Sequence, residues 1–87
     1  MIKPTNFTIE EGQSPLKRIR ELMGGISQEE LARRIGVSAQ TVSRWERGLW
    51  AATLTLPQAK ALDRELTSIG LTLQDLPDTF GPLSKPF

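Results

Sequence analysis

Apolar residues recur with helical spacing in four stretches of the chain, and polar residues fill the positions between them. The apolar positions are Leu16, Ile19, Leu22 and Met23, then Leu31 and Ile35, then Val42 and Trp45, and finally Ala59, Leu62, Leu66 and Ile69. Residues three, four or seven apart lie on one side of an α-helix. The pattern therefore predicts four amphipathic helices that bury these side chains in a common core.

Capping residues indicate where the four helices begin. The predicted N-cap residues are Ser14, Ser27, Ser38 and Thr55, whose side-chain oxygens can accept a bond from a free helix N–H. Glu30 follows Ser27 by three residues and Gln58 follows Thr55 by three, which is the spacing of a capping box. With glycines at the helix ends, these signals predict helices over 15–23, 28–35, 38–47 and 56–69.

The two ends of the chain lack this pattern. Residues 1–14 place Phe7 and Ile9 between polar residues, which fits one short extended segment or a flexible arm, and we expect a flexible N-terminal arm. Thr72 begins a short fifth helix that Pro77 ends. The tail at 77–87 is rich in proline, so we expect it to be extended. The sequence thus predicts one all-α domain over 15–76.

Composition excludes several classes of function. The 87 residues include no cysteine and no histidine, so disulfides, thiolate metal sites and the commonest general base are absent. No apolar run approaches the ~20 residues that cross a bilayer, and no signal-peptide pattern follows Met1. We therefore expect a soluble cytoplasmic protein with no cofactor, no metal, no membrane association and no enzymatic activity.

Charge is unevenly distributed, although the net charge is only +1. Residues 17–47 hold seven basic and four acidic residues, whereas the rest of the chain holds four basic and six acidic ones. A concentration of positive charge attracts polyanions. Arg33 and Arg34 lie on the outer side of the second predicted helix, where they are either a solvated pair or phosphate contacts.

A connection of only three residues, Gly-Val-Ser at 36–38, joins the second and third predicted helices. So short a connection prevents an antiparallel hairpin, so the helices cross steeply and the outer face of the third points into solvent. Gln40, Arg44 and Arg47 share that face. Gln can bond adenine and Arg can bond guanine in the DNA major groove, which admits one helix. The pattern predicts that residues 38–47 recognise DNA.

The stretch at 27–48, SQEELARRIGVSAQTVSRWERG, resembles the helix-turn-helix of the Xre, or phage-repressor/Cro-like, DNA-binding domains. The resemblance implies a compact five-helix, lambda-repressor-like bundle. It also implies that Gln28 clamps a phosphate and that Arg20 pairs with Glu46. Ala39 stands where several phage repressors have glutamine, and its methyl group could contact a thymine methyl.

Two sets of DNA contacts are expected on this basis. The base-contacting residues are Ala39, Gln40, Ser43 and Arg44. The phosphate-contacting residues are Ser27, Gln28, Thr41 and Arg47. Gln28 stands at a helix N-terminus, where free N–H groups and the helix dipole favour an anion.

The segment at 49–54 is apolar, whereas proteins of the family usually have polar or basic residues there. The simplest interpretation is that Leu49 and Leu54 complete the core. Trp50 either packs within the chain or lies in a homodimer contact, where rigid aromatic side chains bury much area. The candidate dimer contacts are Trp50, Leu54 and Phe80, and Phe80 could instead fold back on the core.

Two classes of function fit these features. The first is a sequence-specific transcriptional regulator of a bacterium or phage, associated with the nucleoid. It binds double-stranded DNA as a homodimer on a near-palindromic operator, with half-sites about one helical turn apart. The second is a protein-interaction module, or an antitoxin with a protein partner, on the same fold. Salt-sensitive binding to DNA would distinguish the first class.

Overall fold

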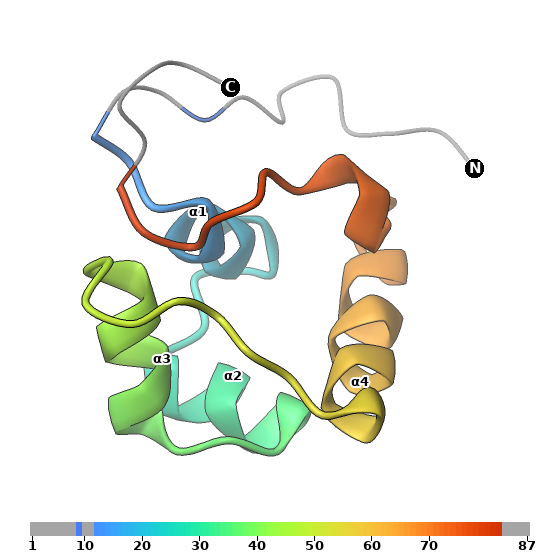
Figure 1. Ribbon diagram of the computed structural model, residues 1–87. Coiled ribbons are helices and arrows are strands. Elements are labelled where there is room, and N and C mark those ends of the chain that lie inside the picture. The colour runs from blue at the N-terminus through green and yellow to red at the C-terminus, as the bar shows by residue number, and fades with distance from the viewer. Residues whose placement is uncertain (1–8, 10–11, 83–87) are drawn as a thin grey trace.

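The computed structural model describes residue 9 and residues 12–82. This part of the chain forms α1 (Pro15–Leu22), α2 (Gln28–Ile35), α3 (Ala39–Glu46), α4 (Leu56–Thr67) and the 3₁₀ turn η1 (Leu73–Asp75), without a strand (Figure 1). The all-α class is confirmed. The predicted fifth helix is only a 3₁₀ turn, because three residues fit between its cap at Thr72 and the extended residue Leu76.

Side-chain capping forms at all four α-helices. The hydroxyls of Ser14, Ser27, Ser38 and Thr55 each accept a bond from the backbone N–H three residues on, at 3.2, 3.0, 3.1 and 3.3 Å. The capping box at Thr55 is complete, since Gln58 Oε1 accepts the Thr55 N–H at 2.9 Å. The box predicted at Ser27 shows only its serine half, because the Glu30 carboxylate bonds the two arginines of α2 instead.

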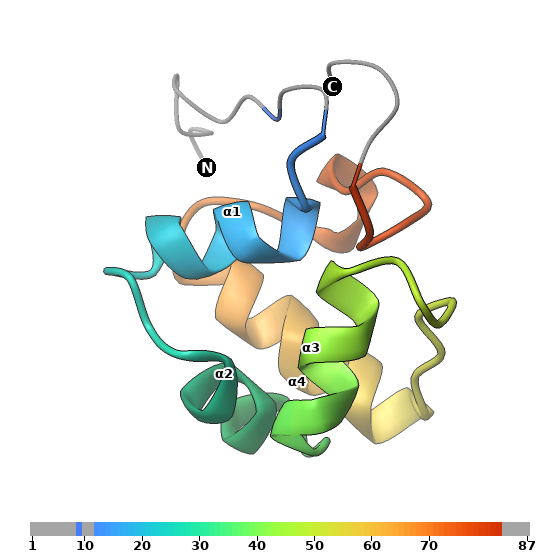
Figure 2. The same ribbon diagram turned by 90° about the vertical axis from the view of Figure 1, so that its left-hand side faces the viewer.

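α2 and α3 form the helix-turn-helix. Figures 1 and 2 show α2 lying crosswise at the N-terminal end of α3 rather than alongside it. Gly36 ends α2 in the left-handed conformation, and the N–H groups of Gly36 and Val37 both donate to the Ala32 carbonyl, at 2.9 and 3.0 Å. The turn thereby sends α3 away from α2, which leaves one side of α3 uncovered.

One core joins all four helices. Its buried apolar side chains are Leu16, Ile19, Leu31, Ala32, Ile35, Val42, Trp45, Ala61, Leu62, Leu66, Leu71 and Phe80. Leu54 packs against this core as predicted. Leu49 is 60% exposed, so the prediction that it completes the core is wrong. The turn at Gly48 directs Leu49 outward.

The ends of the described chain return to the domain. Ile9, within the predicted arm, is only 1% exposed, whereas the rest of the arm at 1–8 and 10–11 lies outside the described residues. Phe80 packs its ring against Trp45 at a centroid distance of 5.7 Å, so it folds back on the core. Its carbonyl accepts a bond from the buried Ser14 hydroxyl at 2.7 Å.

The C-terminal segment also packs against the end of α3, where Figure 2 shows the red segment beside the green helix. A Cβ atom on Gly81 would lie 2.6 Å from the Cα atom of Gly48, so this close backbone approach requires glycine. Residues 83–87 of the predicted tail lie outside the described residues. None of the described helices is both long and apolar enough to cross a bilayer.

Candidate nucleic-acid interface

The uncovered side of α3 is polar. The inward side chains of α3 are Val42, Trp45 and Glu46. Successive helix residues turn by about 100°, so the opposite side carries a further group, namely Gln40, Ser43, Arg44 and Arg47. Of this group, Gln40 and Arg47 are exposed, and Ser43 and Arg44 are partly exposed. We call these four residues the α3 outer face.

The other two predicted DNA contacts on α3 lie at the margins of the outer face. Ala39 is half-buried and packs against the core. The Thr41 hydroxyl lies 2.8 Å from the Ser38 hydroxyl, so these two groups share a hydrogen bond. The structure therefore gathers Gln40, Ser43 and Arg44 on one open surface and sets Ala39 apart from them.

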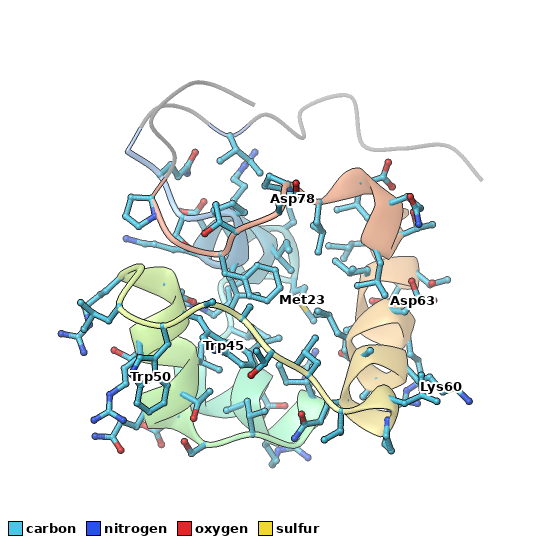
Figure 3. All side chains as sticks on the ribbon, in the orientation of Figure 1. Met23, Trp45, Trp50, Lys60, Asp63 and Asp78 are labelled. Atoms are coloured by element: carbon cyan, nitrogen blue, oxygen red, sulfur yellow. The ribbon has the colours of Figure 1, made fainter. Side chains whose placement is uncertain are left out.

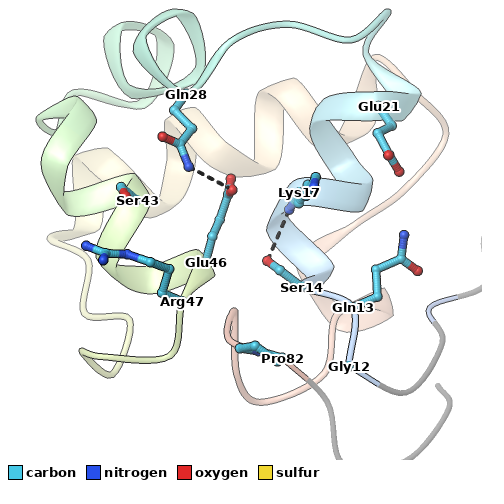
Figure 4. A pocket seen from close by; sticks show the side chains of 10 residues that line it. All are labelled: Gly12, Gln13, Ser14, Lys17, Glu21, Gln28, Ser43, Glu46, Arg47 and Pro82. Carbon is cyan, nitrogen blue, oxygen red and sulfur yellow. Dashed lines mark hydrogen bonds between the residues drawn. The ribbon is translucent and has the colours of Figure 1, made fainter.

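A buried ion pair holds α3 in place on its inward side, opposite the α3 outer face. The Glu46 carboxylate, 8% exposed as a residue, accepts bonds from Arg20 Nε and Nη2, both at 2.8 Å. Gln28 Nε2 donates to the same carboxylate at 3.0 Å, as Figure 4 shows. The pairing of Arg20 with Glu46 that the family resemblance implied is confirmed. One carboxylate thus ties together α1, α2 and α3.

Arg20 also fixes the loop between α1 and α2. Its Nη1 atom donates to the Ile26 carbonyl at 3.0 Å. The hydrogen bonds to Glu46 raise the pKa of Arg20, whereas burial opposes that rise. The guanidinium therefore stays charged, and three of its donors are bonded within the protein, so it acts as a structural link between α1, α3 and the loop.

Among the described residues, the arginines of α2 form ion pairs with carboxylates, whereas the arginines of the α3 outer face do not. Arg33 and Arg34 both bond Glu30, and Arg34 also bonds Glu65 at 3.2 Å. Their hydrogen bonds, that of Arg33 first, lower the pKa of Glu30 to about 2. By contrast, Lys17, Arg44 and Arg47 have no ion pair within the described part of the chain. Arg44 and Arg47 both belong to the α3 outer face.

An open hollow of about 590 Å³ lies between the start of α1, the start of α2 and the end of α3 (Figure 4). Its lining includes Lys17, Gln28, Ser43 and Arg47. Sequence reasoning missed Lys17, because only helix packing places it across from Arg47, thirty positions later. Ser27, at the N-cap of α2, is exposed close by in the chain. No cluster of potential metal ligands occurs among the described residues.

Trp50 lies beside the α3 outer face. It is 50% exposed, and the Arg44 guanidinium carbon lies 4.2 Å from the centroid of its ring. Of the other candidate dimer contacts, Leu54 is partly buried and Phe80 is 7% exposed. A homodimer contact at Trp50 remains a prediction.

Comparisons with known proteins agree with this architecture. A family model described as helix-turn-helix matches residues 16–71. A protein of Methanothermobacter thermautotrophicus, named as an uncharacterized HTH-type transcriptional regulator, is 46% identical over 43 residues. That match covers 47% of this chain and 62% of the relative, so the chain spans less than two thirds of the relative's length. No solved structure gives a significant match.

Proposed function

Because the chain belongs to the Xre/Cro-like helix-turn-helix family, we propose that it is a sequence-specific DNA-binding transcriptional regulator. The observation that carries this proposal is the α3 outer face, which is polar, open and supported from behind by the Glu46 carboxylate. A helix presented in this way fits the major groove. The two arginines of the outer face lack ion pairs among the described residues, which suits a polyanion.

In this proposal, three residues of the α3 outer face contact bases and the fourth contacts a phosphate. Gln40, Ser43 and Arg44 meet base edges, with Gln40 suited to adenine and Arg44 to guanine. Arg47 and Gln28 meet the phosphates that border the groove. An amide group has two N–H donors, so Gln28 can bond Glu46 with one and a phosphate with the other.

Three other side chains have supporting roles in this proposal. The hydroxyls of Ser27 and Thr41 lie at the N-terminal ends of α2 and α3, where each can donate to a phosphate while it keeps its bond within the protein. Lys17 reaches the same strand from the far side of the hollow. Ala39 contributes only a methyl group at the edge of the base-contacting surface.

The proposed regulator binds as a homodimer. Two copies of α3 would enter successive major grooves of a near-palindromic operator, about one helical turn apart. Trp50 has two candidate roles, a dimer contact or a contact with Arg44 of its own chain. Phe80 is not available for it, because that ring is buried against Trp45. The proposed location of such a protein is the cytoplasm, in association with the nucleoid.

Selection of bound fragments from random DNA, followed by titration of the selected operator, tests the proposal. Arg44→Ala should weaken binding to the preferred operator by ~1–3 kcal/mol and relax the preference at one base pair. Arg47→Ala should weaken binding to all sequences by a similar factor and reduce the salt slope by about 1. Titration of protein mass against DNA counts the subunits.

A matched control comes from α2. Arg33 is engaged with Glu30 and lies outside the α3 outer face, so Arg33→Ala should change operator affinity much less than either variant above. A uniform loss of affinity in the Arg44 variant would make Arg44 a phosphate contact. Absence of any sequence preference in the wild-type protein would refute the proposed function itself.

A second candidate rests on the exposed apolar side chains. Leu49, Trp50 and Leu56 are 60, 50 and 68% exposed, and such residues are common in protein interfaces. A protein-interaction module, or an antitoxin, would use them to bind a partner. Tight binding of a partner that Arg44→Ala leaves intact, without DNA binding, would favour this second function.

A further inference from the structure

The chain after α3 folds back on the α3 outer face. Gly48 has a φ of +74°, in the left-handed region that glycine adopts readily. The Leu49 N–H donates to the Arg44 carbonyl at 2.9 Å, which closes the turn. This reversal brings Trp50 alongside Arg44, and Figure 3 shows the Trp50 ring standing next to α3. The backbone turn therefore accounts for the distance of 4.2 Å between the Arg44 guanidinium carbon and the centroid of the Trp50 ring.

Stacking holds an arginine without occupying its hydrogen-bond donors. The five N–H donors of a guanidinium lie in its plane, whereas an aromatic ring contacts its face. Within the described residues, the Arg44 side chain has no hydrogen bond or ion pair. Its orientation therefore depends on Trp50, and its donors remain available for a partner.

Other arginines of the domain are held in the opposite way. Arg20, Arg33 and Arg34 are all held through their N–H donors by carboxylates. A guanidinium that is held through its donors has fewer left for a base. Arg44 differs from these three because an aromatic face, not a carboxylate, restrains it.

We propose that Trp50 is a positioning residue for DNA recognition. It restrains the Arg44 guanidinium by its face, so that the in-plane donors are already directed at one guanine edge before the complex forms. This inference rests on the proposed function, because it names how one base contact gains its geometry. Trp50 acts through Arg44 and does not itself contact a base.

The expected size of the effect follows from the exposure of the pair. A cation–π contact at a partly exposed site corresponds to about a two- to fivefold change in an equilibrium constant. Trp50→Ala should therefore weaken binding to the selected operator by about two- to fivefold. It should also reduce discrimination at the base pair that Arg44 contacts, because a mobile arginine accepts several geometries.

A double-mutant cycle tests the inference. Operator affinity is measured for the wild type, Trp50→Ala, Arg44→Ala and the double variant, on the selected operator and on one changed at the Arg44 base pair. We expect Trp50→Ala to have no further effect once Arg44 is replaced. Trp50→Phe keeps an aromatic face and should retain most of the affinity. Thr53→Ala, at an exposed position of the same loop, is the matched control and should bind normally.

A measurement without DNA checks the stacking itself. The ring current of Trp50 should shift the NMR signal of the Arg44 Nε–H group in the free protein. Trp50→Ala should remove that shift, and Thr53→Ala should not. Far-UV circular dichroism checks that each variant is folded.

Several outcomes would overturn the inference. An equal loss from Trp50→Ala with and without Arg44 would show that Trp50 acts independently, and dissociation of a dimer by this change would place Trp50 in the subunit contact. A gain in affinity would show that stacking withdraws Arg44 from DNA, and an unmoved Nε–H signal would show that no stacking exists. If the wild-type protein selects no operator, both the proposed function and this inference are refuted. A selective protein without coupling refutes the inference alone.

Discussion

Replacement of Glu46 by glutamine tests whether the buried ion pair holds the recognition helix. The Glu46 carboxylate accepts three bonds, two from Arg20 at 2.8 Å and one from Gln28 at 3.0 Å. The two charged side chains are only 16% and 7% exposed. Glutamine keeps the shape but removes the charge, and it places an N–H₂ group where donors already converge. Arg20 is then left charged, largely buried and without a counter-ion.

The size of the effect follows from that burial. Removal of one partner of a buried ion pair costs about 3–5 kcal/mol. Arg20 keeps its bond to the Ile26 carbonyl and some solvent contact, so we expect the lower end, about 3 kcal/mol. A domain of this size has a total stability of about 5–10 kcal/mol. At about 4–8 °C per kcal/mol, the melting temperature should fall by ~12–24 °C.

Urea and thermal denaturation, followed by circular dichroism and by tryptophan fluorescence, measure this loss. Glu30→Gln is the matched control, because Glu30 also bonds two arginines but lies on the surface of α2. The control should shift the melting temperature much less. Equal shifts in the two variants would refute the reasoning that burial gives the Arg20–Glu46 pair its weight.

The remaining predictions concern a surface carboxylate and the C-terminal segment. Because the pKa of Glu30 falls from 4.5 to about 2 on folding, its ion pairs stabilise the protein above pH 4.5, and this stabilisation is lost as the pH falls towards 2. The difference in melting temperature between the wild type and Glu30→Gln should therefore shrink over that window, and a constant difference would contradict the assignment. Gly81→Ala would place a Cβ atom 2.6 Å from the Gly48 Cα atom, so it should cost about 1–3 kcal/mol in urea denaturation, whereas unchanged stability would show that the segment can move aside freely.

The local structure of this protein could be predicted from its amino-acid sequence. Hydrogen bonds that cap the helices join residues three positions apart, as between Ser38 and Thr41. Hydrophobic spacing places Val42 and Trp45 inside and Gln40 outside, because the helix period is fixed. These features depend only on near neighbours, which is why the four helices and the α3 outer face could be predicted with small errors at the ends.

The contact between Arg20 and Glu46 could be predicted for a different reason. The residues are 26 positions apart, and no local rule joins them. The resemblance to the helix-turn-helix family supplied the pairing. The distances then show that Gln28 shares the same carboxylate, so a predicted phosphate contact is also a structural link.

The surroundings of the α3 outer face depend on contacts between residues that are far apart in the sequence. The C-terminal segment closes over α1 through the bond between Ser14 and Phe80, 66 positions apart. The turn at Gly48 turns Leu49 outward, against the sequence prediction, and sets Trp50 against Arg44. These contacts depend on how the packed helices and the reversed backbone meet in space. Hydrophobic periodicity describes only which side of each helix is buried, so it does not predict such contacts.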